Sequence, residues 1–407
     1  MAEHSSDTSG PFIPTAMPSV SATAPLPQEN KRPTAPILIA GGGIAGLATA
    51  IALQQAGFDA IAYERSDEVQ PAGAGIILAP NALRALETIG LADRIRRAGY
   101  SCVEGMAITN IKGNALAKQA STLHEPLIAI HRAELHRLLL GALQPGTYRP
   151  GHGLASFEQR HDGVTVTFES RQRTEGSGLI SAEGLNSLVR SQLLPGTRLR
   201  YAGYTCWRGI APMQPQGICT ETWGVGSRFG IVPLPGGATY WYALINASAR
   251  DAELAELTRS ELAASFHHYH EPVATLIEST PEDAIIHRDI VDFAPIPQFA
   301  FGRVLLIGDA AHAMTPNLGQ GACQAIEDAI CLAECMKRYG PAGLAEAFQA
   351  FESLRRTRTA AIVNRSRAVG RIAQLGNPAL CHLRDAALRL TPASATRKQL
   401  QFLYDPR

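Results

Sequence analysis

Short apolar runs alternate along this chain with segments of helical period, which is the pattern of a mixed α/β protein. Residues 37–40 read Ile-Leu-Ile-Ala and lead through a glycine-rich turn into a helical pattern over residues 44–56. A second apolar run, Ala-Ile-Ala-Tyr, follows at residues 60–63. Two short runs separated by one helix predict a β-α-β unit with parallel, buried strands.

Short apolar runs and helical periods continue to alternate through the first half of the chain. A strand at residues 75–78 precedes a helix from 81 through 89, and residues 101–122 predict two further strands. Residues 124–200 return to helix and strands, including a hairpin over residues 157–168.

Extended runs then dominate residues 201–295 and predict an antiparallel sheet, with one helix near residues 259–279 between two of its segments. The sheet strands are expected at residues 204–210, 229–234 and 239–245. Gly224-Val225-Gly226 lies between two of these strands and opens no helix, so it predicts a hairpin turn and not a second nucleotide-binding loop.

Residues 303–336 repeat the strand-turn-helix pattern of the N-terminal part, and residues 342–390 are helical. Because the two patterns interleave, we expect domains built from discontinuous segments. We assign 35–100, 123–200 and 296–340 to a Rossmann-like domain, 101–122 and 201–295 to an antiparallel-sheet domain, 1–34 to a disordered segment, and 341–407 to a C-terminal helical segment.

Composition narrows the class of protein only a little. The chain has 407 residues and a net charge of +1, so no global field favours a nucleic-acid or anionic-membrane partner. The Ser-, Thr- and Pro-rich start lacks the features of a signal peptide, and the uncharged stretch 35–58 contains five glycines and no long apolar run, which argues against a membrane span. We therefore expect a cytoplasmic enzyme that is a monomer or a homodimer.

Cysteine and histidine positions give no sign of a metal site. The seven cysteines form no C-x-x-C pair, and an odd number fits reduced, mostly buried thiols in the cytosol. The cluster His267-His268-Tyr269-His270 lies in a helical pattern without nearby partner ligands. We expect no metal.

Two glycine signatures carry the chemistry. The first, Gly41-Gly42-Gly43-Ile44-Ala45-Gly46, follows a strand and opens a helix, which is the geometry that seats a pyrophosphate on backbone amides. Glu64 ends the second strand, about where an acid accepts hydrogen bonds from an adenosine ribose. The second signature, Ile307-Gly308-Asp309, again follows an apolar strand and precedes a helix.

Together with the residues between them, these signatures resemble the group A flavoprotein monooxygenases, the single-component FAD-dependent aromatic hydroxylases. The ordered motifs of that family appear here from about residue 36 to residue 367 as Gly41/Gly43/Gly46, Glu64-Arg65, Arg132, Glu183-Gly184 and Gly308-Asp309. Glu183 departs from the family pattern, which has an aspartate at that place. The resemblance implies that the Rossmann-like domain binds FAD and that the antiparallel sheet binds substrate.

The resemblance also assigns residues to the cofactor. It implies one non-covalent FAD, with the Asp309 carboxylate on the ribitol and the amides of residues 319–321 near the flavin pyrimidine edge, where the helix dipole favours negative charge. The implied FAD-binding residues are Gly41, Gly43, Ile44, Ala45, Gly46, Glu64, Arg65, Gly75, Arg132, Asp309, Pro316, Gly319, Gln320 and Gly321.

The reaction that the resemblance implies is hydroxylation of a small anionic aromatic or heteroaromatic ring, with NADPH or NADH as reductant and a flavin C4a-hydroperoxide as the oxygen donor. The branch with salicylate, 3-hydroxybenzoate and urate hydroxylases is the most similar, and it gives Arg228 and Tyr240 the catalytic roles. Strand alternation places Tyr204 with Arg208 on one face, and Tyr240 with Tyr242, so we expect Tyr204, Arg208, Tyr242 and Pro316 to contact substrate.

Other activities of the same fold stay open at this point. Epoxidation, N-hydroxylation and antibiotic inactivation use the same oxygen chemistry, and a flavin dehydrogenase would share the cofactor domain. A flavin halogenase is disfavoured because its W-x-W-x-I-P sequence is missing. A flavin carrier without catalysis is the least favoured alternative.

Overall fold

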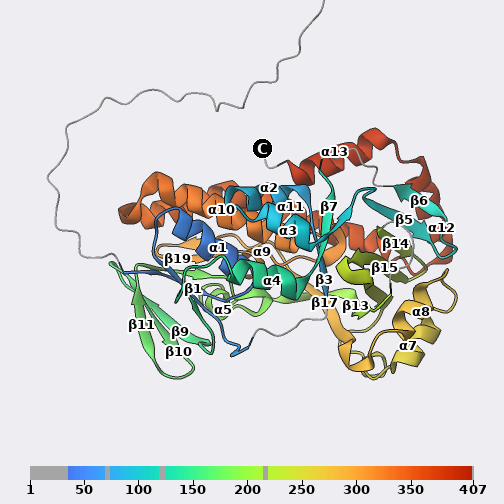
Figure 1. The fold of residues 1–407 in the computed structure, drawn as a ribbon, viewed down its shortest axis with the longest axis horizontal. Coiled ribbons are helices and arrows are strands. Elements are labelled where there is room, and N and C mark those ends of the chain that lie inside the picture. The colour runs from blue at the N-terminus through green and yellow to red at the C-terminus, as the bar shows by residue number, and fades with distance from the viewer. Residues whose placement is uncertain (1–34, 69–73, 119–124, 214–218, 406–407) are drawn as a thin grey trace, which may run out of the picture. The chain divides into compact units, whose positions relative to one another are not determined.

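The computed structural model describes residues 35–68, 74–118, 125–213 and 219–405, and the expected disordered segment 1–34 lies outside them. The described residues pack together as one unit. Its helices and strands are labelled in Figure 1.

The β-α-β prediction at the start of the chain is correct. Strand β1 (Ile37–Ala40) pairs in parallel with β2 (Ala60–Tyr63), and helix α1 (Ile44–Gln55) connects them. A six-stranded sheet grows from this pair in the order β18-β19-β12-β1-β2-β8. Its other strands are β8 (Tyr148–Arg149), β12 (Gly178–Ser181), β18 (Ala300–Phe301) and β19 (Val304–Leu306). All its pairings except β18–β19 are parallel, so a Rossmann-like sheet is present.

A second, seven-stranded sheet has the order β17-β13-β16-β15-β14-β5-β6 and is antiparallel except for the β14–β5 pair. Its strands are β5 (Met106–Asn110), β6 (Ala115–Lys118), β13 (Leu199–Ala211), β14 (Cys219–Trp223), β15 (Ser227–Leu234), β16 (Ala238–Asn246) and β17 (Ile286–Phe293). Each strand predicted for this sheet is present, and residues 224–226 form the predicted turn between β14 and β15.

The two faces of the seven-stranded sheet have different chemistry. Trp207, Phe229 and Trp241 lie on one face and pack with Phe266 beside helices α7 (Arg259–Ser265) and α8 (Val273–Glu278) in a buried apolar cluster. Side chains at the alternate positions lie on the other face, which carries most of the predicted substrate residues. The single helix expected near residues 259–279 is wrong, because a turn and Pro272 separate two short helices there.

Two three-stranded sheets complete the β-structure. One has the order β3-β7-β4 and the other the order β11-β10-β9, which contains the predicted 157–168 hairpin. Their strands are β3 (Gly75–Leu78), β4 (Tyr100–Cys102), β7 (Leu127–His131), β9 (Leu154–Gln159), β10 (Val164–Phe168) and β11 (Arg173–Gly176).

Short helices connect the strands, and long helices follow them. The short ones are α2 (Pro80–Thr88), α3 (Ala92–Ala98), α4 (Arg132–Leu140), α5 (Leu188–Leu193), α6 (Ala252–Ala255) and α9 (Asp309–His312), with 3-10 turns at Gly184–Asn186 (η1), Pro235–Gly237, Glu282–Ala284, Pro316–Leu318 (η4) and Pro341–Gly343. The long ones are α10 (Gly321–Tyr339), α11 (Leu344–Ala373), α12 (Pro378–Leu390) and α13 (Ala393–Tyr404). Among the described residues, none of the helices is long and apolar enough to cross a membrane.

Helices α10 and α11 lie side by side (Figure 1). Buried charged side chains join them. Arg355 of α11 donates from Nε to Asp328 Oδ1 and from Nη1 to Glu327 Oε2 on α10, at 2.6 Å in both cases. Asp328 Oδ2 also accepts from the amide of Gly308, at 2.9 Å, and lies 2.6 Å from His312 Nε2. The second glycine signature is therefore held in place by α10 and α11.

Candidate functional site

The first glycine turn packs tightly on one side and is open on the other. Gly41 has φ +107°, and a Cβ there would overlap the carbonyl oxygen of Ala182. A Cβ on Gly46 would overlap the carbonyl of Gly41, so α1 approaches the turn as closely as its backbone allows. A Cβ on Gly43, in contrast, would meet no atom of residues 35–68, 74–118, 125–213 or 219–405 within 4 Å. The open space thus lies at the N-terminus of α1.

Glu64 and Arg65 have different surroundings. The Glu64 carboxylate accepts from the amides of Gly42, at 2.7 Å, and Ser66, at 3.0 Å, so it borders the glycine turn. Arg65 makes an exposed ion pair with Glu169 at 3.4 Å. The structure therefore brings Glu64 to the turn and leaves Arg65 in a surface pair.

The second glycine signature meets the first. A Cβ on Gly308 would lie 3.0 Å from the Cβ of Ala45, beside Ile44 at the start of α1. Asp309 follows at the start of α9 and is exposed to solvent. Burial among protein atoms nevertheless raises the pKa of its carboxyl, and the charges of His312 and Arg132 lower it in part. A carboxylate that is both accessible and surrounded by protein lies in a cleft.

The turn before α10 also borders open space. Gly319 adopts the left-handed conformation with φ +61°, and an added Cβ would have no atom of the described part of the chain within 4 Å. The buried Gln320 Nε2 has no hydrogen-bond partner among the described residues. An added Cβ on Gly321 would lie 3.8 Å from Asp309 Oδ1, which places this helix start next to the Asp309 cleft, with the exposed Pro316 before it.

These observations fit a dinucleotide that carries a flavin. Two helix N-termini, α1 and α10, present backbone amides to space that none of the described residues fills. An accessible carboxylate, Asp309 at the start of α9, and an amide of Gln320 without a partner in the described part of the chain lie beside the start of α10. The side chain of Arg132 is exposed, and its charge acts on both Asp309 and Tyr240, so it lies near the same cleft.

Glu183, which stands where the family has an aspartate, forms its hydrogen bonds with residues close to it in the chain. Its Oε2 accepts from Ser181 Oγ at 2.9 Å, Ser187 Oγ at 2.8 Å and the amide of Val189 at 3.1 Å. The longer side chain therefore holds the N-terminal turn of α5 in place. No such role was foreseen from the sequence.

The polar face of the seven-stranded sheet lies next to these turns. The ring of Tyr240 lies against β3, because a Cβ on Gly75 would be 2.6 Å from it. Burial raises the pKa of Tyr240, and the charges of Arg208 and Arg132 oppose that shift. Tyr242, two residues on, has its ring centroid 5.9 Å from that of Tyr240. The predicted pair of Tyr240 and Tyr242 shares its face with Arg208, because the strand register places Arg208 directly opposite Tyr242.

Arg228 is almost completely buried, and every nitrogen of its guanidinium has a partner. Nε donates to Gln374 Oε1 at 3.0 Å, Nη1 to Glu221 Oε1 at 2.9 Å, and Nη2 to Asn317 Oδ1 at 2.8 Å. The guanidinium also lies 5.4 Å from the ring centre of Tyr204. Asn317 belongs to η4, between Pro316 and Gly319, so this arginine is tied to the turn before α10.

Glu221 is a site residue that the sequence reasoning missed. It ion-pairs with Arg228 and accepts hydrogen bonds from Tyr242 Oη at 2.6 Å and from Trp223 Nε1 at 2.8 Å. A signal for it was present, because the turn at 224–226 places Trp223 opposite Arg228. Glu221, two residues before Trp223, then shares the face of Arg228.

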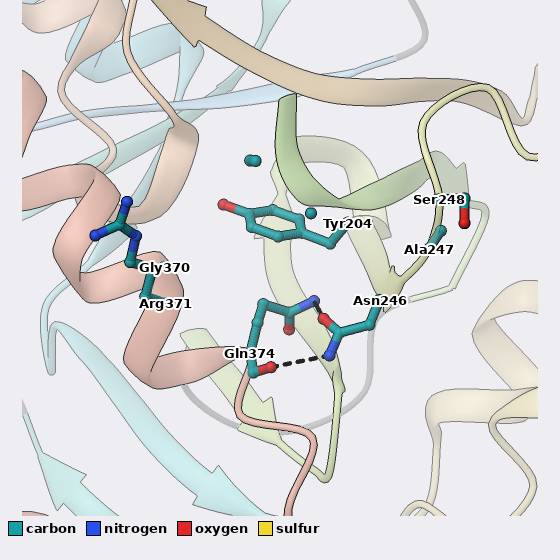
Figure 2. A pocket seen from close by; sticks show the side chains of 9 residues that line it. Tyr204, Asn246, Ala247, Ser248, Gly370, Arg371 and Gln374 are labelled. Carbon is teal, nitrogen blue, oxygen red and sulfur yellow. Dashed lines mark hydrogen bonds between the residues drawn. The ribbon is translucent and has the colours of Figure 1, made fainter. Parts of the chain in front are cut away.

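A solvent-open pocket of about 500 Å³ lies beside this cluster and was also missed (Figure 2). Its lining includes Tyr204, Asn246, Arg371 and Gln374. Figure 2 shows Gln374 beside Asn246, whose Nδ2 donates to the backbone carbonyl of Gln374 at 3.0 Å. Because Gln374 Oε1 also accepts from Arg228 Nε, this residue connects the pocket lining to Arg228.

Comparison with known proteins identifies the family. A family model described as FAD binding domain matches residues 34–366. The chain is 37% identical to the aurachin C monooxygenase/isomerase of Stigmatella aurantiaca, over 90% of this chain and 98% of that protein. It is 35% identical to the 2-heptyl-3-hydroxy-4(1H)-quinolone synthase of Pseudomonas aeruginosa, over 90% and 97%.

A solved structure agrees. The crystal structure of Klebsiella pneumoniae HpxO complexed with FAD and uric acid has a TM-score of 0.82 and 27% sequence identity, and the match covers 90% of this chain and 96% of that one. The fold, the two glycine signatures and these matches lead to one conclusion. The chain belongs to the group A flavoprotein monooxygenases and is an FAD-dependent monooxygenase of the aromatic hydroxylase family.

Proposed function

We propose that this enzyme uses NADH or NADPH to hydroxylate a small aromatic or heteroaromatic ring that is anionic when it reacts. The observation that carries the proposal is the position of Arg228, Tyr240 and Tyr242 on the sheet face beside the FAD cleft. An arginine that cannot lose its proton supports negative charge on a bound ring.

The residues divide into those that hold the cofactor and those that hold the ring. The residues around Gly43, Asp309, Arg132 and Gly319 would hold FAD, and the chemistry that bound FAD supplies is activation of O2 after reduction by NAD(P)H. Tyr240 and Tyr242 would form the wall that excludes water from the ring and keeps it oriented.

The names of the relatives favour nitrogen heterocycles. One relative makes 2-heptyl-3-hydroxy-4(1H)-quinolone, and the K. pneumoniae structure is complexed with uric acid. Both names describe fused rings that carry a ring N–H. We therefore propose a 4(1H)-quinolone or a ring of similar chemistry as the substrate class.

A substrate panel tests the proposal directly. We expect 2-heptyl-4(1H)-quinolone, uric acid or an aromatic acid to stimulate NAD(P)H oxidation, and ¹⁸O₂ to place labelled oxygen in the product. Stimulated oxidation without labelled product would indicate a flavin dehydrogenase. Failure of every ring compound to stimulate oxidation would contradict the proposal.

We also propose a cytoplasmic location. All seven cysteines lie in described residues as free thiols, and six of them are buried, which fits a reducing compartment. Fractionation of cells that produce the protein tests this.

A further inference from the structure

Glu221 is the acceptor at the centre of the polar face of the substrate sheet. Its side chain is 13% exposed, and the structure directs three donors to it, from Trp223, Arg228 and Tyr242. The bond from Tyr242 Oη to Glu221 Oε2, at 2.6 Å, is short enough for a charge-assisted hydrogen bond. Tyr242 thus connects Glu221 to the predicted substrate side of the sheet.

A glycine allows this connection. Glu221, Gly230 and Tyr242 are cross-strand neighbours on β14, β15 and β16. A Cβ on Gly230 would overlap the ring of Tyr242, so the ring lies directly over the glycine. Because position 230 has no side chain, Tyr242 reaches across β15 to the carboxylate on the next strand.

The positive charge of Arg228 is compensated within the protein by the negative charge of Glu221. Arg228 is paired with Glu221 at 2.9 Å, and its remaining nitrogens donate to the neutral amides of Asn317 and Gln374. The other titratable groups near Glu221 are Tyr242, Tyr204 and Tyr269, whose pKa values the Glu221 charge raises, while Arg384 lies over the ring of Trp223 and pairs with Asp385. A ring that arrived as an anion would meet a guanidinium whose charge is already compensated, with the Glu221 carboxylate beside it.

We propose that Glu221 accepts, through Tyr242, the acidic N–H or O–H proton of a substrate that enters the site neutral. The substrate proton moves to Tyr242 Oη as the Tyr242 proton moves to Glu221 Oε2, so the N–H or O–H bond breaks and a carboxylic acid forms. The negative charge leaves Glu221 and appears on the ring. Arg228 then exchanges its counter-ion, from the Glu221 carboxylate to the substrate anion. This inference rests on the proposed function and deepens it, because it names the charge state in which the substrate binds.

Tyr242 is the relay in this arrangement and Glu221 is the proton acceptor. Burial raises the pKa of Tyr242 well above its usual range, and the Glu221 carboxylate raises it further. Its hydroxyl therefore stays protonated and can pass a proton only by receiving another. Tyr242 remains partly accessible although protein surrounds it, as a group that meets a ligand must be.

Two variants test the relay from its two ends. Glu221→Gln keeps the size of the side chain but removes the proton acceptor, and Tyr242→Phe keeps the ring over Gly230 but removes the relay. The matched control is Glu175→Gln, on the exposed strand β11 outside the substrate sheet. Each purified holoenzyme is first checked for an unchanged FAD absorbance spectrum, which reports an intact cofactor site.

The probe is 2-heptyl-4(1H)-quinolone, assayed for kcat/KM as a function of pH, with its ultraviolet difference spectrum recorded on binding. We expect the spectrum of the quinolone anion on binding to wild type and to Glu175→Gln at neutral pH, and that of the neutral quinolone on binding to the other two variants. At neutral pH, kcat/KM of Glu221→Gln and Tyr242→Phe should fall about a hundred-fold or more and should recover as the pH rises toward the ionisation of the free quinolone.

The outcomes separate this inference from the proposed function. A wild-type enzyme that hydroxylates the quinolone, together with variants that keep its pH profile and its bound-anion spectrum, overturns the role of Glu221. A loss of activity in either variant that high pH does not restore also overturns it, because the defect is then structural. A wild type that oxidises none of the ring compounds contradicts the proposed function itself.

Discussion

At the residue scale, Asp309 and Glu183 are two acids of the family motifs with opposite surroundings. Asp309 is accessible in the FAD cleft, and Glu183 is saturated by Ser181, Ser187 and the start of α5. Asp309 can therefore bind a ligand, whereas the Glu183 carboxylate is already hydrogen-bonded within the protein.

We therefore expect Asp309→Ala to weaken FAD binding more than Glu183→Ala. Loss of a charged hydrogen bond to the cofactor should cost about 1.5–3 kcal/mol, roughly ten- to a hundred-fold in Kd. Glu183→Ala should instead lower the free energy of unfolding of the apoprotein, because it leaves two buried hydroxyls without their acceptor. FAD titration and denaturant unfolding of both variants check this, and an equal loss of FAD affinity would refute the ranking.

For Arg228→Gln we expect FAD binding and reduction by NAD(P)H to persist while hydroxylation falls. A ring that has lost its counter-charge is misplaced, and misplacement by about 1 Å can cost on the order of a hundred-fold in rate. Oxygen should then be released as hydrogen peroxide, which a peroxidase-coupled assay quantifies. Arg208→Gln, on the neighbouring strand, should have a milder effect. Full product yield in Arg228→Gln would remove Arg228 from the substrate site.

The Gly43→Ala variant tests whether FAD occupies the open space beside Gly43. The added Cβ meets no atom within 4 Å among the residues that the structure describes, and the φ of −76° suits alanine. The apoprotein should be unchanged or about 0.4–1 kcal/mol more stable, because alanine restricts the unfolded chain. FAD affinity should fall about ten-fold or more if the cofactor lies against Gly43.

The control for this prediction is Gly196→Ala. An alanine there also meets no protein atom, and Gly196 lies outside both glycine turns. It should leave FAD affinity unchanged, measured by the same titration. Unaltered FAD binding in Gly43→Ala would show that the cofactor lies elsewhere.

The residues that the sequence placed correctly are those whose geometry is local. The glycine turns and the alternation of Tyr240 with Tyr242 follow from spacing alone. The partners of Arg228 do not, because Gln374 lies 146 residues further along the chain and Asn317 lies 89. The role of Arg65 in binding FAD stays a prediction.

At the element scale, α10 and α11 are coupled through Asp328. Burial by itself would raise the pKa of this carboxyl, but the charges of His312 and Arg355, with hydrogen bonds from His312 and Gly308, lower it to about 2. A group whose folded pKa is lower than its unfolded value of 3.8 stabilises the fold above that value. This stabilisation is lost as the pH falls from about 4 toward about 2.

We expect Asp328→Asn to lower the free energy of unfolding by about 3–5 kcal/mol at neutral pH, because it leaves the buried Arg355 without one of its two carboxylates. The difference between wild type and variant should shrink as the pH falls through this range. Denaturant unfolding at several pH values measures it. A difference that stays constant with pH would show that Asp328 is not ionised in the folded protein.

Elements with a clear period were predicted well, and the error at residues 259–279 has a physical cause. Those residues keep an apolar helical spacing, which packs Leu262, Phe266 and Leu276 into one cluster. Pro272 prevents a continuous helix, and the backbone turns between α7 and α8. Apolar spacing indicates which side chains are buried, but it does not reveal that α7 ends at Ser265 and that α8 begins only after Pro272. The assignment of segments to two domains stays a prediction.

At the scale of the whole molecule, one set of glycine turns predicts one non-covalent FAD per chain. The thiol of Cys323, in the first turn of α10, is buried, and burial raises its pKa to about 12, so it stays protonated and unreactive. Absorbance of the purified protein should give one flavin per chain. Acid precipitation should release all of it, whereas flavin that stays with the pellet would indicate a covalent bond.

The strand order β18-β19-β12-β1-β2-β8 also governs when this cofactor site can exist. A ribosome releases β1 and β2 early, but their sheet grows on one side only when β12 and then Val304–Leu306 emerge. Asp309 and Gly319 follow still later. Pairing between such distant segments is slow and leaves unpaired strand edges exposed in the meantime. A nascent chain interrupted before Val304 therefore has a finished first glycine turn but no place for a flavin, so cofactor capture waits until Gly319 has left the ribosome.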